Sequence, residues 1–142
     1  MIPKFRAWIK TEKRMIETYN LLDIDFENEV IMTQKVYFEN GLPVDRDLDN
    51  FVFKEIELMQ STGLKDKNGK EIFEGDIVDY KGRKAVVKWH GSYASFIYRF
   101  VDELQERKSE WKPLYLAYYH FEVIGNIYEN KELLEDKEVD KQ

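Results

Sequence analysis

The stretch Leu58–Val78, LMQSTGLKDKNGKEIFEGDIV, decides the fold of this chain. It predicts a strand, a tight turn, a short second strand, a corner at Gly75-Asp76 and the first strand of a second structural unit. The turn begins at Asp66 and reaches Gly69 at its fourth position, and these are the residue preferences of a type I turn. We therefore expect a β-hairpin here.

Two loop lengths are open to this hairpin, and they place different charges opposite each other. A three-residue loop with its last residue in the left-handed conformation puts Lys65 opposite Glu71. A two-residue loop would instead face Lys67 with Lys70 and Asp66 with Glu71. Because directly opposed like charges cost about 0.2–1 kcal/mol per pair, the three-residue loop is favoured.

The same turn contains part of a calcium-loop pattern, since Asp66, Asn68 and Glu71 surround a glycine. A complete loop needs a further ligand before the glycine and a Glu six residues after it, and both are missing here. A structural turn is the favoured interpretation. We expect neither a metal site nor a cofactor.

Three segments of the chain carry a resemblance to a known family. They are Ile2–Trp8 (IPKFRAW), Gly63–Val78 (GLKDKNGKEIFEGDIV) and Val123–Asn130 (VIGNIYEN). Together they resemble the YopX-like family of phage and prophage proteins over essentially the whole chain. The resemblance implies a strand-rich, prophage-encoded protein of Gram-positive bacteria whose function is uncertain, and it supplies no catalytic residues.

Composition excludes several classes of protein. Apolar residues make up 43% and aromatic residues 15% of the 142, which argues for a folded chain of one ordinary domain or two small ones. There is no cysteine, so disulfides, thiol nucleophiles and thiolate metal sites are excluded. No apolar run approaches the roughly 20 residues of a membrane span, and the N-terminus lacks the apolar core of a signal peptide. We expect a soluble, cytoplasmic protein that has no membrane partner.

The net charge of −6 is unevenly distributed. Residues 1–16 carry +4, residues 17–57 carry −8 and residues 81–112 carry +4. Such asymmetry is typical of a surface that meets a partner, or of copies of one chain that dock to one another.

Residues 1–73 are expected to form a strand-rich N-terminal region that ends with the signature hairpin. Period-two alternation predicts a strand over Phe5–Ile9 and an antiparallel return over Met15–Tyr19. Short strands are expected at 30–32 and 36–38, a strand-like segment at 51–60, a chain break at 40–43, and loops at 20–28 and 45–50.

Residues 74–129 are expected to form an SH3-like, five-stranded small barrel. Its strands are placed at 77–80, 85–89, 94–100, 114–118 and 122–127, with an insertion at 101–112 that contains a short helix. Residues 130–142 form a charged C-terminal tail with one helical turn at 130–134. The fold class is mainly β, of the α+β type.

The sequence offers no catalytic motif. His90 and His120 lack partners at metal-ligand or general-base spacing, so a place at the barrel rim or in its core is favoured for both. Asp76 and Asp79 fall on opposite faces of one strand and are not a carboxylate pair. Asp76 is better explained as a turn residue whose side chain accepts hydrogen bonds from nearby backbone amides. We expect a non-enzymatic protein.

Two groups of side chains are candidates for binding a partner. The first is a basic band over 81–112, in which Lys84, Lys88 and His90 share the outer face of one strand, while Tyr93, Phe96 and Tyr98 lie between the cations. Its candidate residues are Lys81, Arg83, Lys84, Lys88 and Arg99, with Arg107, Lys108 and Lys112 following. The second is an aromatic segment whose members either fill the barrel or form a subunit interface; its candidates are Trp111, Tyr115, Tyr118 and Tyr119.

These features lead to two functional hypotheses. The first is a self-assembling protein–protein interaction module, a homo-oligomer with a possible host or phage partner in the cytoplasm of the host. The second is a nucleic-acid-binding module that uses the basic band, because cations beside aromatic rings bind single strands. The acidic net charge weighs against the second, and lysines on an exposed strand also prevent edge pairing.

Overall fold

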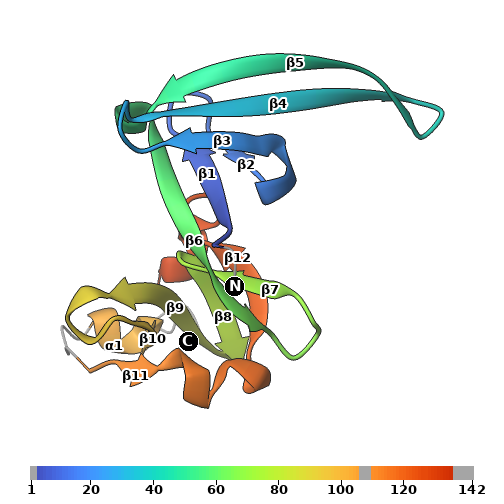
Figure 1. Ribbon diagram of the computed structural model, residues 1–142. Helices are drawn as coiled ribbons and strands as arrows, with labels where there is room; N and C mark the ends of the chain where they lie inside the picture. Colours follow the sequence, from blue (N-terminus) through green and yellow to red (C-terminus); the bar gives the residue numbers. More distant parts are fainter. Residues whose placement is uncertain (1–2, 106–109, 136–142) are drawn as a thin grey trace. The chain divides into compact units, whose positions relative to one another are not determined.

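The structure, a computed structural model, describes residues 3–105 and 110–135 of the chain. Within these residues it contains twelve strands, several short 3₁₀ turns and one five-residue α-helix, which confirms the expected mainly β class. The chain divides into two compact units, residues 1–60 and 61–142 (Figure 1). This division comes earlier than the domain boundary expected at 73/74.

The first unit is built from antiparallel strands. β1 (Phe5–Ile9) pairs with β2 (Arg14–Ile16) on one side and with the first half of β6 (Ile56–Lys65) on the other. A second sheet has the order β3-β4-β5. Its strands are β3 (Leu21–Asp25), β4 (Val30–Glu39) and β5 (Leu42–Val52), and the 3₁₀ turns are η1 (Thr18–Asn20) and η2 (Phe53–Glu55).

The β4–β5 hairpin, which we call the ribbon, corrects two expectations. The segments 30–32 and 36–38 belong to one ten-residue strand, and the polar residues 45–50 lie in β5, not in a loop. The prediction of a loop at 20–28 is also wrong in part, because β3 occupies its centre. Asn40 and Gly41 make a two-residue turn with φ of 53° and 80°, the signs that a type I′ hairpin turn requires. Figure 1 shows the ribbon extending beyond β3.

The core of the first unit lies between its two sheets. Alternate residues of β1 and β4 point into it, so that Ala7, Ile9 and Ile31 are almost fully buried. β5 contributes Phe51, and β6 contributes Ile56. The ribbon is therefore anchored at its base by Ile31 and Phe51, whereas every residue from Leu42 to Asn50 is exposed.

The second unit contains a five-stranded antiparallel sheet with the order β11-β10-β9-β8-β12. Three neighbouring strands of the expected barrel are confirmed at 76–80, 83–90 and 95–100, and the last at 122–126. The strands of this unit are β7 (Glu71–Phe73), β8 (Asp76–Tyr80), β9 (Arg83–His90), β10 (Ser95–Phe100), β11 (Lys112–Pro113) and β12 (Glu122–Asn126). The short helical elements are α1 (Val101–Gln105), η3 (Gly91–Tyr93), η4 (Leu114–Leu116), η5 (Tyr118–His120) and η6 (Lys131–Leu134).

One strand of this unit was misplaced by the sequence pattern. The apolar run 114–118 forms 3₁₀ turns, and the short strand that pairs with β10 precedes it at Lys112–Pro113. The expected short helix and terminal helical turn are confirmed as α1 and η6. Residues 136–142 of the expected charged tail, like Arg107 and Lys108 of the basic band, lie outside the described residues.

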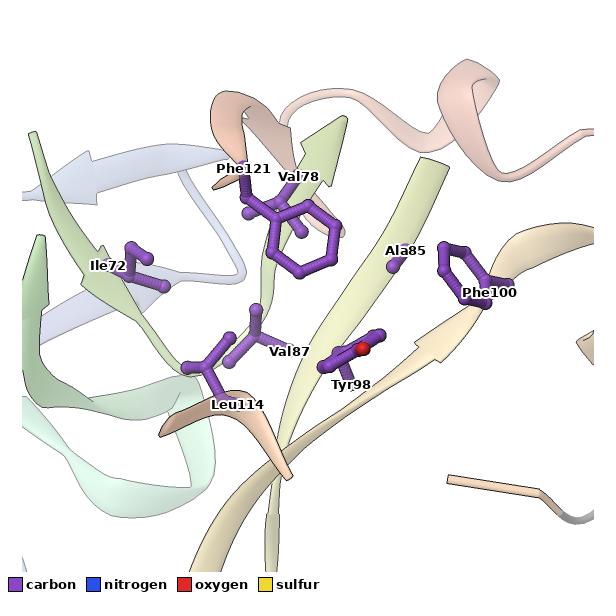
Figure 2. Close-up of a cluster of buried hydrophobic side chains, with 8 residues drawn as sticks. All are labelled: Ile72, Val78, Ala85, Val87, Tyr98, Phe100, Leu114 and Phe121. Carbon is purple, nitrogen blue, oxygen red and sulfur yellow. The ribbon is translucent and has the colours of Figure 1, made fainter. Parts of the chain in front are cut away.

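Side chains of this sheet point alternately to its two faces, and each face is buried in a separate hydrophobic core. The inner face carries the larger core, to which β9 contributes Ala85 and Val87. Figure 2 shows the eight buried members of that core: Ile72, Val78, Ala85, Val87, Tyr98, Phe100, Leu114 and Phe121. The opposite face carries Ile77 and Val86, which pack with Val101 of α1 and with partly buried leucines of η6.

The signature hairpin has the predicted three-residue loop. Lys65 lies opposite Glu71, the Asp66 amide donates to the Lys70 carbonyl oxygen at 2.7 Å, and Gly69 is left-handed with φ 84°. Only glycine adopts this conformation without strain. The predicted role of Asp76 is also confirmed, because its carboxylate accepts a hydrogen bond from the Phe73 amide at 2.7 Å.

The Asp66 carboxylate joins the signature hairpin to β12 through hydrogen bonds to backbone amides of both segments. Its carboxylate accepts hydrogen bonds from the amides of Asn68 (2.9 Å), Lys70 (2.8 Å) and, far along the chain, Val123 (2.8 Å). The Lys67 amide adds a bond to the Phe121 carbonyl oxygen at 2.9 Å. The calcium-loop resemblance thus has a structural explanation, since these carboxylate oxygens are occupied by backbone donors.

The segment Val123–Asn130 is held by a second group of side chain–backbone hydrogen bonds. The Asn126 side-chain oxygen accepts from the amides of Tyr128 and Glu129, and the Asn130 side-chain oxygen accepts from the Asn126 amide at 3.1 Å. Gly125 lies directly under Asn130, and a Cβ added there would fall 2.9 Å from the Asn130 Cβ.

Replacing Gly125 by alanine is therefore expected to destabilise the second unit by about 1–3 kcal/mol, because Asn130 must move away and release the Asn126 amide. Urea unfolding measures the change. Gly91→Ala is the matched control, since the nearest atom to its added Cβ would be the Trp89 Nε1, 4.0 Å away. Equal midpoints for the two variants would contradict the packing described here.

Candidate interaction surfaces

The ribbon presents two chemically different faces because its side chains alternate. Ile31 and Thr33 are buried, so the even-numbered residues of β4 point away from the core. The strand register places even-numbered residues of β5 beside them. The resulting outer face carries Val30, Met32, Val36, Leu48 and Val52, which we call the apolar row, and the polar residues Gln34, Arg46 and Asn50 lie among them. Met32, Leu48 and Val52 are 37%, 52% and 38% exposed, more than their packing neighbours in the core.

The opposite face of the ribbon becomes acidic beyond the core. Asp45, Asp47 and Asp49 follow one another at alternate positions of β5, and we call them the acidic row. The Tyr37 hydroxyl donates to the Asp47 carboxylate at 2.7 Å, and the Lys35 ammonium lies over the Tyr37 ring. The hydrogen bond to Asp47, followed by burial and the nearby carboxylates, raises the pKa of Tyr37. The three carboxylates thus act on the Tyr37 hydroxyl, while Lys35 of β4 lies directly opposite Asp47.

The basic band is split by the structure. The strand register puts Lys84, Lys88 and Arg99 on one face, with Arg99 directly opposite Val86. Val86, which lies between Lys84 and Lys88 on this face, is buried in the smaller core. The apolar side chains packed on Val86 therefore separate the cations of this face. The Lys81 ammonium lies over the Tyr80 ring at 5.3 Å. The five candidate cations therefore do not form one continuous surface.

Arg83 is engaged within the second unit. Its Nε and one terminal nitrogen donate to the two oxygens of Asp102 at 2.9 and 3.0 Å, and it reaches Glu103 at 3.3 Å. Its guanidinium also lies 3.6 Å from the centre of the Phe100 ring. A bidentate, stacked arginine of this kind is held in one geometry, which leaves little of its charge for a phosphate.

The aromatic segment divides between core and surface. Leu114 and Phe121 are buried, and Tyr118 is partly buried against them. Tyr115 and Tyr119 are 60% and 54% exposed, so they are the predicted interface candidates that solvent reaches. Trp111 packs its ring against His90 and Tyr93, with 4.9 Å between the centres of each pair of rings.

The histidines take part in aromatic packing. His120 lies between Tyr119 and Tyr80, with ring centres 4.2 and 5.5 Å away, and His90 belongs to the cluster with Trp111. Over residues 3–105 and 110–135, no group of His, Asp or Glu side chains has the geometry to hold a metal ion. Within the same residues, no helix combines the length and the apolar character needed to cross a membrane.

The apolar row and the acidic row were missed by sequence reasoning. The motif Asn40-Gly41 between two apolar segments was an available sign of a hairpin. Pro43 and the alternating aspartates argued against a strand, because these residues are depleted in strands. Proline is nevertheless accepted by an edge strand, and alternate aspartates mark one face of it.

Comparison with known proteins agrees with this architecture. Residues 4–135 match the family described as YopX protein. A solved structure, that of protein EF1440 from Enterococcus faecalis, is 33% identical, and the match covers 95% of this chain and 99% of that chain with a TM-score of 0.60. No curated protein matches. The family that the three sequence segments predicted is thus confirmed: the chain belongs to the YopX protein family.

Proposed function

We propose that this protein is a non-enzymatic protein–protein interaction module that self-assembles through the outer face of its ribbon. The observation that carries the proposal is the apolar row, whose members stand on a sheet face open to solvent. Exposed apolar side chains gathered on one sheet face are typical of interaction sites, and here Gln34, Arg46 and Asn50 lie among them. Two such faces can stack about 10 Å apart, as sheets do in a sandwich.

The cytoplasm of a bacterial host is the compartment we propose, with a phage or prophage gene as the origin. The family resemblance supports both. We also infer that the five-stranded sheet is an SH3-like half-barrel. Four consecutive strands are neighbours in it, and β12 returns after the 3₁₀ turn η5 to pair with β8. This order supports the inference.

A nucleic-acid-binding module is the second candidate. Lys84, Lys88 and Arg99 on a shared face favour it, whereas the engagement of Arg83 with Asp102 and Glu103 weighs against it. The absorbance ratio at 260 and 280 nm of protein purified at low salt without nuclease distinguishes the two. A raised ratio that falls when salt is added would favour nucleic acid.

Light scattering after size-exclusion chromatography tests the leading proposal. We expect the wild type to elute as a discrete multiple of 17.1 kDa with a protein-only absorbance ratio. The double variant Met32→Lys/Leu48→Lys should elute as a folded monomer, because stacking would bury four new charges without partners in a dimer.

Tyr115→Lys/Leu116→Lys is the matched control, since it makes the same kind of change at two 60% exposed residues of the second unit. This control should assemble like the wild type. A monomeric wild type would contradict self-assembly, and loss of assembly in the control alone would move the interface to the aromatic segment. A turnover activity abolished by replacing one polar side chain would contradict the non-enzymatic assignment.

A further inference from the structure

The edge strand β5 offers a second binding feature, separate from the apolar row. In the described part of the chain β5 pairs only with β4, so its other side presents backbone amide and carbonyl groups along an eleven-residue strand. Figure 1 shows this edge running along the length of the ribbon. An edge of this length is a template for an added strand.

The charges on β5 disfavour an antiparallel second copy of β5 as that strand. When two antiparallel copies pair in one sheet, opposed residues lie on the same face, and both therefore have odd numbers or both even numbers. Asp45, Asp47 and Asp49 are all odd. Every register in which the acidic rows overlap thus opposes one aspartate with another, and opposed like charges are destabilising.

The rest of the chain, over residues 3–105 and 110–135, offers no complementary edge strand either. The other described edge strands are β2, β3, β7, β11 and β12. Only β2 and β11 carry a cation, Arg14 and Lys112, and both strands are short. Arg14 is already bound to Glu12 at 2.7 Å. Lys84 and Lys88 belong to β9, which is paired on both sides. Charge complementarity therefore points to a segment of another protein.

We propose that β5 receives, as an added β-strand, a segment of a different protein that carries Lys or Arg at three alternate positions. Its cations face Asp45, Asp47 and Asp49, and its intervening residues are apolar, because the other face of β5 carries the exposed apolar side chains Val44 and Leu48, one on either side of Arg46. Backbone hydrogen bonds hold the strand, and the cross-strand charge pairs select it. The inference deepens the proposed function by naming the partner of the ribbon.

Fluorescence anisotropy with the full-length protein tests the proposal. The probe is a labelled peptide of alternating valine and lysine with three lysines, and a peptide of the same composition with its lysines in one block is the control. We expect the alternating peptide to bind about tenfold more tightly than the block peptide. N-methylation of alternate backbone nitrogens, which removes donors and keeps the charge, should abolish binding.

Variants of the protein complete the test. Asp45→Asn/Asp47→Asn/Asp49→Asn preserves side-chain shape and should weaken binding about tenfold, as the lost charge pairs require. Glu17→Gln/Glu27→Gln/Glu29→Gln makes the same charge change at other exposed residues of the first unit and should bind like the wild type. Equal binding of the two peptides, or no effect of N-methylation, would overturn strand addition.

The result of the peptide-binding experiment can be distinguished from the result of the self-assembly experiment. Met32→Lys/Leu48→Lys probes the apolar row and is read by mass, whereas the triple asparagine variant probes the acidic row and is read by anisotropy. A protein that assembles and binds neither peptide would overturn this inference and leave the proposed function standing. A monomer that binds the alternating peptide would overturn self-assembly alone.

Discussion

Replacing Asp66 by alanine should destabilise the protein by about 3 kcal/mol, because three backbone amides lose a buried, charged acceptor. Burial alone would raise the pKa of the Asp66 carboxyl. The hydrogen bonds from Val123, Lys70 and Asn68 together outweigh burial, so the pKa lies below its ordinary value. Chemical denaturation at neutral pH measures the loss of stability.

The sign of this pKa shift gives the Asp66 contribution a pH dependence. A carboxyl whose pKa is lower in the folded than in the unfolded state stabilises the fold above its unfolded pKa of about 3.9. That stabilisation is lost as the pH falls through the folded pKa. The difference in stability between the wild type and Asp66→Ala should therefore shrink below about pH 4.

Two further variants sharpen the Asp66 experiment. Asp66→Asn can keep the acceptor oxygen that serves Asn68 and Lys70, but it turns an amide group towards the Val123 amide, so its loss should be intermediate. Asp79→Ala removes a turn carboxylate that accepts one exposed bond, from the Gly82 amide at 3.2 Å, and should cost about 0.5 kcal/mol. Equal effects of Asp79→Ala and Asp66→Ala would contradict the central role of Asp66.

Replacing Phe121 by alanine should have an effect of about 3–5 kcal/mol, as expected when a buried aromatic ring leaves a cavity. Phe121 is 2% exposed, and its ring centre lies 4.9 Å from that of Tyr98 in an edge-on arrangement. Figure 2 shows its ring among the buried side chains of the larger core. Urea unfolding followed by tryptophan emission measures the change.

Two control variants accompany Phe121→Ala: one removes fewer side-chain atoms at the same position, and the other removes an aromatic ring at an exposed position nearby. Phe121→Leu keeps the apolar contact and should cost less than about 1.5 kcal/mol. Tyr119→Ala, two residues away and 54% exposed, should change stability by no more than about 0.5 kcal/mol. If Tyr119→Ala cost as much as Phe121→Ala, the buried place of Phe121 in the core would be contradicted.

Local chemistry explains why the signature hairpin could be predicted. The choice between two loops depended on which charges face each other within seven residues, and the pairing of Lys65 with Glu71 decided it correctly. The same holds for Asp76, whose acceptor role follows from its place in a turn. Here the sequence neighbours are also the spatial neighbours.

Tertiary context explains what could not be predicted. The strand propensity of β5 is poor, yet pairing with β4 over the whole ribbon holds it extended. The run 114–118 is as apolar as a strand, but Leu114 turns inwards from a 3₁₀ segment that follows Pro113. Arg83 and Asp102 pair across nineteen positions, which no spacing rule indicates. The candidate surfaces are determined by contacts between residues distant in sequence, and to a greater extent than the fold is.

A distance between two spin labels tests the central claim most directly. Because the chain has no cysteine, Asn50→Cys gives a single labelling site, and residue 50 lies on the outer face of the ribbon opposite Met32. Pulsed electron paramagnetic resonance should give a distance between copies below about 30 Å, as two sheet faces stacked about 10 Å apart require. A broad, long-distance signal, or the signal of a monomer, would contradict assembly through the apolar row.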